Sequence, residues 1–204
     1  MNLKVIISAV IGYLLGSINT SIIVGKIFFR TDVRKHGSGN AGATNTLRTL
    51  GKGAAIAVVI GDFLKGALAC IIGRIVAGEM MPEVYAGEYL GGMLAVIGHN
   101  WPVYFGFRGG KGVMTSFAIV MMFSPLAGLI CLAVFIIIVA LTRYVSLGSI
   151  MAAAIFPLVV FLLGEPLLMT VVSIFLALLI IVRHSSNIKR LIEGNEKKLS
   201  FNKR

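Results

Sequence analysis

Long apolar segments alternate along the chain with short polar linkers. A transmembrane helix needs about 20 predominantly apolar residues, and most of these segments approach that length. The pattern predicts an all-α protein, a polytopic transmembrane helix bundle. The apolar segments run over residues 3–25, 54–77, 84–101, 113–123, 125–141, 147–163 and 166–183.

The linkers alternate in charge. Residues 26–52 carry six cations and one acid, residues 78–88 carry three acids, and the tail from Arg183 carries seven cations and two acids. The four linkers between 101 and 167 are, in order, basic, neutral, basic and acidic. Because cations are retained on the cytoplasmic side, this alternation predicts seven spans, with the N-terminus outside and the C-terminus cytoplasmic.

The segment 113–123 is short for a span. The alternative is one long helix over 113–141, kinked at Pro125, which gives six crossings and places the basic tail on the side that its charge disfavours. Pro102 also shortens the preceding segment. Two short spans then flank the glycine-rich loop 108–112, which we expect to lie below the headgroups and to line a wet cavity.

Composition agrees with a membrane protein. The 204 residues are 57% hydrophobic, with a net charge of +11 and a mean hydropathy of +0.94. The cations lie in short linkers, without the basic stripe and interleaved aromatics of a nucleic-acid-binding protein, so no nucleic acid is expected as a partner. Cys70 and Cys131 fall inside apolar segments and are interpreted as small core residues. We predict a single transmembrane domain over 1–192 and a basic cytoplasmic tail over 193–204.

A polar run over 37–48 lies in the first basic linker. Its glycines match the G-x-G-x-x-G dinucleotide fingerprint, but polar residues precede them instead of a buried strand, so nucleotide binding is excluded. Flexible backbone N–H groups, hydroxyls, amides and a guanidinium are nevertheless the groups that bind phosphate. The candidates in this run are Gly37, Ser38, Gly39, Asn40, Thr44, Asn45 and Arg48.

A second glycine-rich loop and three smaller polar groups complete the candidates. Lys111 lies among Gly109, Gly110 and Gly112 in a loop that lacks the residues of a Walker A motif. If a helix continues through residues 184–187, His184 and Asn187 share one face. Taken alone, His99 would ordinarily be a capping or core histidine, but we count it with the phosphate-binding candidates. Arg143 and Ser146 belong to the same group.

Asp62 and Lys65 lie three residues apart inside an apolar segment. Because unpaired charges there are costly, we expect a mutual ion pair between these two residues that holds helices together. The chain contains no Ser-His-Asp arrangement, no metal-ligand spacing and no histidine followed four residues later by aspartate, as in the classical acyltransferases. Neither a metal nor a cofactor is therefore expected.

Three motifs together resemble one family. They are GSGNAGATNTLR over 37–48, GHNWPVYFGFRGGKG over 98–112 and RHSSNIKRLIEGNE over 183–196. The chain is similar in these motifs, and in its length, to the integral-membrane, acyl-phosphate-dependent glycerol-3-phosphate acyltransferases of bacteria, the PlsY family. Asn19 and Met114 depart from that family's usual proline and alanine, but both lie outside the groups expected to contact phosphate.

The resemblance implies transfer of a fatty acyl group from acyl phosphate to the 1-hydroxyl of sn-glycerol 3-phosphate, the first acylation step of phospholipid biosynthesis. The products are lysophosphatidate and inorganic phosphate. The active site would face the cytoplasm from the bacterial cytoplasmic (inner) membrane, and membrane lipid would surround the protein. Its functional partner would be an enzyme that makes acyl phosphate. Ser38 and Arg48 would be essential, Lys111 would bind substrate, and Glu196 would be structural.

His184 and Asn187 would, by the same resemblance, belong to the active site. We expect direct attack by the glycerol hydroxyl, which Asn187 orients, with Ser38 donating a hydrogen bond to phosphate or to the developing oxyanion. A covalent acyl-Ser38 intermediate is the alternative mechanism. The alternative function is a membrane transporter or channel for an organic phosphate, although the internal repeats expected of a carrier are absent.

Overall fold

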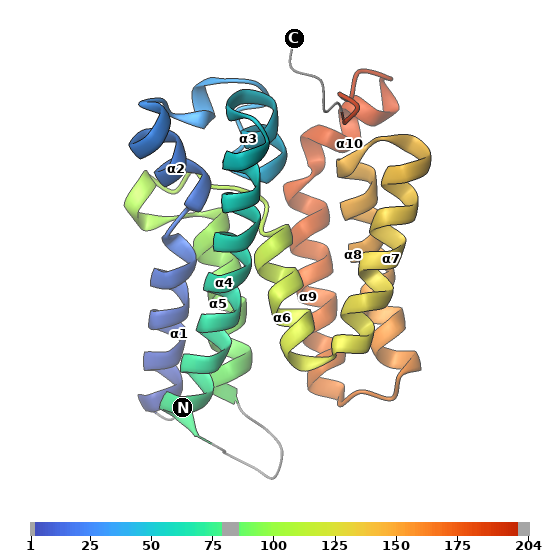
Figure 1. The fold of residues 1–204 in the computed structure, drawn as a ribbon. Coiled ribbons are helices and arrows are strands. Elements are labelled where there is room, and N and C mark those ends of the chain that lie inside the picture. Colours follow the sequence, from blue (N-terminus) through green and yellow to red (C-terminus); the bar gives the residue numbers. More distant parts are fainter. Residues whose placement is uncertain (1–2, 79–85, 200–204) are drawn as a thin grey trace. The chain divides into compact units, whose positions relative to one another are not determined.

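The computed structural model describes residues 3–78 and 86–199, and within these ranges it contains helices and no strands (Figure 1). Parts of the acidic linker 78–88 and the end of the basic tail lie outside the described residues. The chain forms two compact units, the first ending at Ile119 and the second beginning at Val120. Every predicted apolar segment contains a helix, which confirms the all-α prediction.

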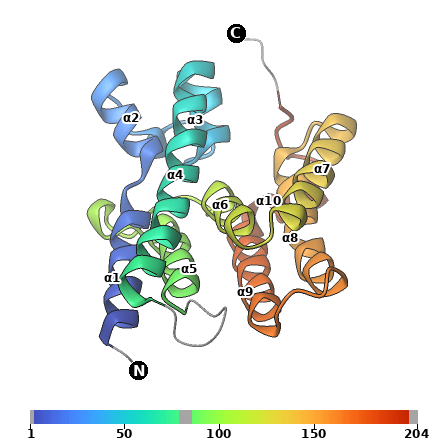
Figure 2. The ribbon, with the colours of Figure 1, turned by 60° about the horizontal axis from the view of Figure 1, so that its bottom comes forward.

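Three helices pack closely together in the first unit: α1 (Leu3–Ser17), α4 (Lys52–Ala77) and α5 (Ala86–Asn100) (Figures 1 and 2). Glycine permits the close approach, because a Cβ at Gly12 would overlap the backbone of Gly91. Small residues at such crossings are typical of transmembrane helix pairs.

The first apolar segment is broken at Asn19. This buried residue caps α2 (Thr20–Phe29) by accepting a hydrogen bond from the Ile22 amide, 3.1 Å away. The short helix η1 (Val33–Lys35) and the helix α3 (Ala43–Leu50) follow. The polar run 37–48 is therefore only partly a loop: its second half is helical.

Below these elements lies a small apolar core. Ile22, Val33 and Ala41 are fully buried, and Leu50 and Phe105 pack against them. Phe105 comes from η2 (Val103–Phe105), which precedes the second glycine-rich loop. α2, the first polar run and η2, which leads into the second loop, thus share one core within the first unit.

A sharp break separates α6 (Val113–Phe123) from α7 (Pro125–Thr142) at Ser124, whose ψ of 83° is not helical. A Cβ at Gly128 would lie 2.5 Å from the Met121 sulfur. Residues seven apart in a continuous helix are separated by about 10 Å along its axis. The chain therefore folds back at Ser124, and 113–141 is not one kinked helix.

The second unit also contains α8 (Val145–Leu162), α9 (Leu167–Arg183) and α10 (Ser185–Ile192). α8 packs against both α7 and α9. The last helical segment does not continue straight, because α10 is bent by 58° from α9 at His184.

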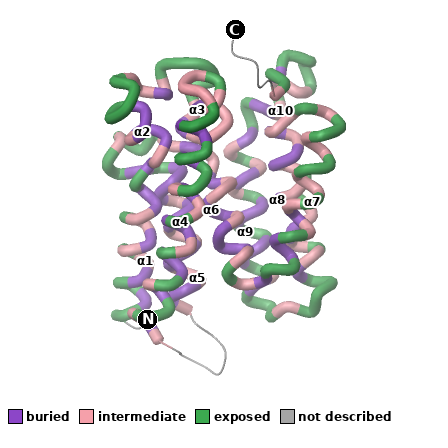
Figure 3. The backbone as a smooth tube through the Cα atoms, in the orientation of Figure 1, coloured by how far each residue is buried: buried purple, intermediate pink, exposed green. Residues whose placement is uncertain are grey.

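Within the described ranges, four segments are long and apolar enough to cross a membrane: Leu3–Phe29, Lys52–Ala77, Pro125–Thr142 and Val145–Leu162. The bent pair α9 and α10 would make a fifth. Figure 3 shows buried and exposed residues alternating along the helices. Many large apolar side chains are exposed, with Leu141 at 78% and Leu167 at 79%, while many small and polar residues are buried. This distribution suits helices whose outer faces meet lipid tails.

Candidate active site

The first polar loop is folded around one buried amide. Asn45 Oδ1 accepts a hydrogen bond from the Ser38 backbone N–H (2.8 Å), while Nδ2 donates to the carbonyls of Val33 (2.9 Å) and His36 (3.1 Å). Gly37 has a φ of 63°, and a Cβ there would overlap Asn45 Oδ1. Asn45 therefore fixes the backbone that carries Ser38, and both hydrogens of its side-chain amide are donated to backbone carbonyls next to the loop.

The residues around this amide are more open. Ser38 and Gly39 are exposed, and Asn40 is partly exposed. Thr44 and Arg48 lie four residues apart on α3, so they share one helical face, and the Arg48 side chain is exposed. The serine and the guanidinium are thus accessible, while the amide that holds the loop is buried.

The second loop passes so close to the end of α5 that no side chain fits. The Gly109 N–H donates to the Asn100 carbonyl (3.2 Å) and the Gly110 N–H to the His99 carbonyl (3.1 Å). A Cβ on Gly110 would overlap His99 Nε2 and would lie 2.6 Å from the carbonyl oxygen of Ala41. Because Ala41 belongs to the first polar run, the two glycine-rich segments meet at Gly110.

Lys111 lies just beyond this meeting point. The buried Gly112, with a φ of 76°, turns the chain into α6. The first N–H groups of a helix have no partner within the helix and favour anions. Lys111 therefore combines a point charge with a helix N-terminus, an arrangement suited to phosphate.

Arg34 joins the two loops. Its Nη1 donates to the carbonyls of Phe105 (2.7 Å) and Arg108 (3.0 Å), and its Nη2 pairs with Asp32 Oδ2 at 2.7 Å. The hydrogen bond from Arg34, opposed by burial, lowers the pKa of Asp32 to about 2. Charge counting did not distinguish Arg34 from the other cations of its linker, although the Asp32-x-Arg34 spacing is a signal of such pairing.

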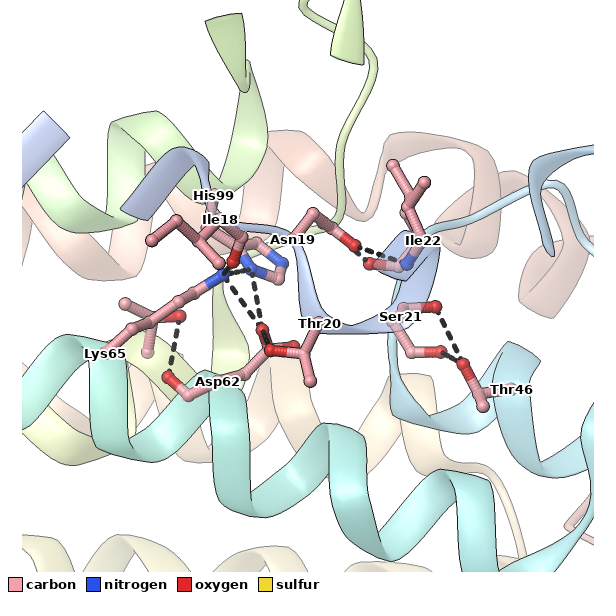
Figure 4. A network of polar contacts seen from close by, with 12 residues as sticks. Ile18, Asn19, Thr20, Ser21, Ile22, Thr46, Asp62, Lys65 and His99 are labelled. Atoms are coloured by element: carbon pink, nitrogen blue, oxygen red, sulfur yellow. Dashed lines mark hydrogen bonds and ion pairs between the residues drawn. The ribbon is translucent and has the colours of Figure 1, made fainter. Parts of the chain in front are cut away.

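The predicted ion pair between Asp62 and Lys65 is present and belongs to a larger network (Figure 4). Lys65 Nζ lies 2.9 Å from each of three acceptors: Asp62 Oδ1, the Ile18 carbonyl and His99 Nδ1. Thr20 Oγ1 donates to Asp62 Oδ1 at 3.1 Å. The network joins the break between α1 and α2 to α4 and α5, and it contains His99, which the sequence placed among the phosphate-binding candidates.

A second polar cluster surrounds Glu196 in the second unit. Oε1 accepts hydrogen bonds from Ser146 Oγ (2.8 Å) and Asn187 Nδ2 (2.7 Å), and Oε2 accepts from Arg190 Nε (2.7 Å). Burial opposes ionisation of this carboxyl, but the three donors together hold its pKa below the usual value. Glu196 thus orients the Asn187 amide. Ser146, a phosphate-binding candidate, donates to a carboxylate here.

His184 lies at the bend between α9 and α10. Its ring is buried, and Nδ1 lies 2.8 Å from the Ile180 carbonyl. Because a carbonyl only accepts, Nδ1 carries the proton, and in the neutral ring the lone pair is on Nε2. Arg143 Nη2 donates to the Leu199 carbonyl (3.1 Å) and so holds the segment that contains Glu196.

The structure therefore gathers the candidates into two groups. The first unit brings together the polar run 37–48 and the loop 109–112, with His99, Asp62 and Lys65 beside them. The second unit brings together Ser146, Asn187 and Glu196, with His184 at the neighbouring bend. The sequence analysis did not single out Arg34 or Arg190. Arg34 pairs with Asp32 and holds the second loop, and Arg190 donates to Glu196.

Comparison with known proteins gives one consistent result. The family model described as glycerol-3-phosphate acyltransferase matches residues 6–194. A glycerol-3-phosphate acyltransferase of Clostridioides difficile is 45% identical over 97% of both chains, and one of Thermoanaerobacter pseudethanolicus is 46% identical over 95% of both. The crystal structure of PlsY (YgiH), an integral membrane glycerol 3-phosphate acyltransferase, in its glycerol 3-phosphate form, has a TM-score of 0.88, with 38% identity and 96% of both chains covered. Its lysophosphatidic acid form has a TM-score of 0.85, with 36% identity, 97% of this chain and 96% of that chain covered.

Proposed function

The chain belongs to the glycerol-3-phosphate acyltransferase family, and from this premise we propose that it transfers a fatty acyl group from acyl phosphate to the 1-hydroxyl of sn-glycerol 3-phosphate. The products are lysophosphatidate and inorganic phosphate. The observation that carries the proposal is the meeting of two glycine-rich segments at Gly110. These segments carry the hydroxyl of Ser38 and the cations Arg48 and Lys111.

Both substrates carry a phosphate, so the protein must bring two anions together. Their repulsion is costly in a partly desolvated site unless cations offset it. Arg48 suits bidentate binding of phosphate and Lys111 suits a point contact. The N–H groups of Ser38, Gly39 and Gly109 are donated within the protein, so the side chains supply the phosphate contacts. We assign Asn45 to positioning the loop, because its amide hydrogens are already donated to carbonyls.

The reaction is a direct displacement. The 1-oxygen of glycerol 3-phosphate attacks the acyl carbon, the bond from that carbon to the phosphate oxygen breaks, and inorganic phosphate leaves. Asn187, oriented by Glu196, positions the hydroxyl, and its proton passes to His184 Nε2 or to a phosphate oxygen. Ser38 donates a hydrogen bond to phosphate or to the developing oxyanion, so charge stabilisation and positioning supply the rate.

A covalent acyl-Ser38 intermediate would require a base beside the hydroxyl. Among the described residues, the interactions of Ser38 include no hydrogen bond from Oγ to histidine, aspartate or glutamate. This geometry favours direct attack. Trapping of a labelled acyl-enzyme with acyl phosphate in the absence of an acceptor would contradict it.

For the membrane topology we propose seven spans: α1 with α2, then α4, α5, α6, α7, α8 and α9. The N-terminus lies outside and the tail over 193–204 is cytoplasmic, so that the active site faces the cytoplasm from the inner membrane. The charge alternation supports this order. The 15 residues of α5 and the 11 of α6 require a thinned bilayer or cover from neighbouring helices. Single cysteines at Asn195 and Gly164, in a variant lacking Cys70 and Cys131, should react with impermeant reagents from opposite sides.

The decisive experiment uses purified protein with acyl phosphate and labelled glycerol 3-phosphate. We expect labelled lysophosphatidate and one phosphate released per acyl transfer, both lost in Ser38→Ala and Lys111→Met. Glu193→Gln is the control, because Glu193 makes only an exposed contact with Lys189 at 3.8 Å. Uptake of an organic phosphate into vesicles without product formation would instead favour the transporter. A co-purifying or co-expressed enzyme that makes acyl phosphate is the partner we expect.

A further inference from the structure

The most concentrated polar group outside the two glycine-rich segments is the buried set formed by Asp62, Lys65 and His99. All three side chains are at most 6% exposed. A simple ion pair within α4 would need only the first two residues. The histidine, however, lies between this pair and Gly110, so the network touches the second loop directly.

The hydrogen positions follow from counting donors and acceptors. An ammonium group has three hydrogens and no lone pair. Lys65 Nζ has three acceptors at 2.9 Å: Asp62 Oδ1, the Ile18 carbonyl and His99 Nδ1. Each hydrogen therefore has one acceptor, and His99 Nδ1 must present its lone pair to the ammonium.

The alternative is a proton moved from Lys65 to His99. Unperturbed lysine holds its proton about four pKa units more tightly than histidine, and the Asp62 carboxylate is closer to Nζ (2.9 Å) than to His99 Nδ1 (3.6 Å). Both effects keep the charge on Lys65. The imidazole is then neutral, with its single proton on Nε2.

The other end of this ring meets the loop. The position of a Cβ on Gly110 would overlap His99 Nε2 and would lie 2.9 Å from Cε1. His99 Nε2 therefore lies beside the place where Gly110 passes Ala41, next to Lys111. The backbone of the same histidine also accepts the Gly110 N–H, at 3.1 Å.

We propose that Asp62 and Lys65 are positioning residues for acyl transfer: they hold His99 as the neutral Nε2–H imidazole, which sets the position of the loop that carries Lys111. The inference rests on the proposed function, since its consequence for catalysis is expressed through phosphate binding at Lys111. It gives a buried ion pair of α4 a role beyond joining helices.

The test separates the two nitrogens of His99. The amide nitrogen of glutamine can replace Nε2–H, whereas that of asparagine can replace only Nδ1. We expect the kcat/KM of His99→Gln for glycerol 3-phosphate to stay within about threefold of the wild-type value. We expect that of His99→Asn to fall about tenfold or more, which corresponds to one hydrogen bond. The fall should come mainly from a higher KM. Equal losses in both variants, with thermal unfolding unchanged, would contradict the proposal.

A spectroscopic measurement tests the tautomer without reference to activity. The chain has three histidines, so ¹³C,¹⁵N-histidine labelling with His99→Gln for assignment identifies the ring at neutral pH. We expect Nε2–H in wild type, and a mixture of tautomers in the neutral double variant Asp62→Asn, Lys65→Met. The control is Arg74→Gln, which removes the 3.9 Å contact with Glu88 elsewhere on α4 and should leave the ring unchanged. A protonated or Nδ1–H ring in wild type would overturn the assignment, whereas absent turnover with the expected tautomer would count against the proposed function instead.

Discussion

Replacement of Arg34 by lysine tests whether the two loops are held together by one side chain. Arg34 contacts Asp32 on its own loop and the carbonyls of Phe105 and Arg108 on the other. Lysine has one ammonium group in place of a planar fork. It can keep the contact with Asp32, but it cannot also reach both carbonyls.

The size of the effect follows from the two lost bonds. Hydrogen bonds from charged donors contribute about 1.5–3 kcal/mol each, but the Arg34 side chain is 22% exposed and water can solvate the released carbonyls. We therefore take about 1 kcal/mol per bond, or about 2 kcal/mol in total, which corresponds to about 30-fold in the equilibrium between closed and open loop. Since Lys111 follows Arg108 by three residues, the loss should appear as a higher KM for glycerol 3-phosphate.

Two measurements check this expectation. Steady-state kinetics at saturating acyl phosphate should give a KM for glycerol 3-phosphate about 10- to 30-fold higher in Arg34→Lys than in wild type, with kcat changed less. Hydrogen exchange should increase over residues 103–110. The matched control is Arg30→Lys, because Arg30 is an exposed cation of the same linker. Unchanged exchange together with kcat/KM within about twofold of wild type would refute the role assigned to Arg34.

Three further predictions concern single groups. Glu196→Gln removes the anion that orients Asn187, so kcat should fall about tenfold or more, whereas Glu193→Gln should match wild type in the same assay. Gly110→Ala should destabilise the loop and abolish most activity because its Cβ overlaps an imidazole, while Gly53→Ala, with open space at its Cβ on α4, should unfold at an equal or higher temperature. The folded-state pKa of Asp32 is lowered to about 2. The stability that Asp32 contributes is therefore complete above its usual pKa of about 4 and is lost as the pH falls towards 2. Acid unfolding of Asp32→Asn should lack the loss of stability that wild type shows in this pH range.

The presence of the helices was largely predictable because hydrophobic length is a strong signal in membrane proteins, whereas the span count and orientation inferred from loop charge stay predictions. Each apolar segment contains a helix, and the reversal at Ser124 follows from proline at the start of a new helix. The break at Asn19 was not predicted, since no proline or glycine marks it. The helix α3 was also hidden, because its residues have the composition of a loop, and it is held by the burial of Asn45 and Thr46.

The structure brings several of the candidate residues together, while their roles in binding phosphate stay predictions. Ser38, Asn45 and Arg48 all looked like phosphate ligands, because the sequence shows a donor without showing what it donates to. In the fold, Asn45 gives both amide hydrogens to carbonyls, so the same chemistry that suits a ligand instead shapes the loop. His99 and Ser146 show the same difference: each was a candidate for phosphate, and each is engaged with a buried charge.

This difference has a physical reason that extends to both groups of residues. A loop that must bind a dianion has to hold several N–H groups and cations close together before the ligand arrives, and their mutual repulsion and lost entropy oppose that order. Buried or partly buried carboxylates offset this cost: Asp32 fixes Arg34, Glu196 fixes Asn187, and Asp62 fixes Lys65. In each case the carboxylate accepts hydrogen bonds from the residue that it holds. Acids of this kind cannot be distinguished from catalytic carboxylates by sequence alone, and the distinction lies in which donors surround them.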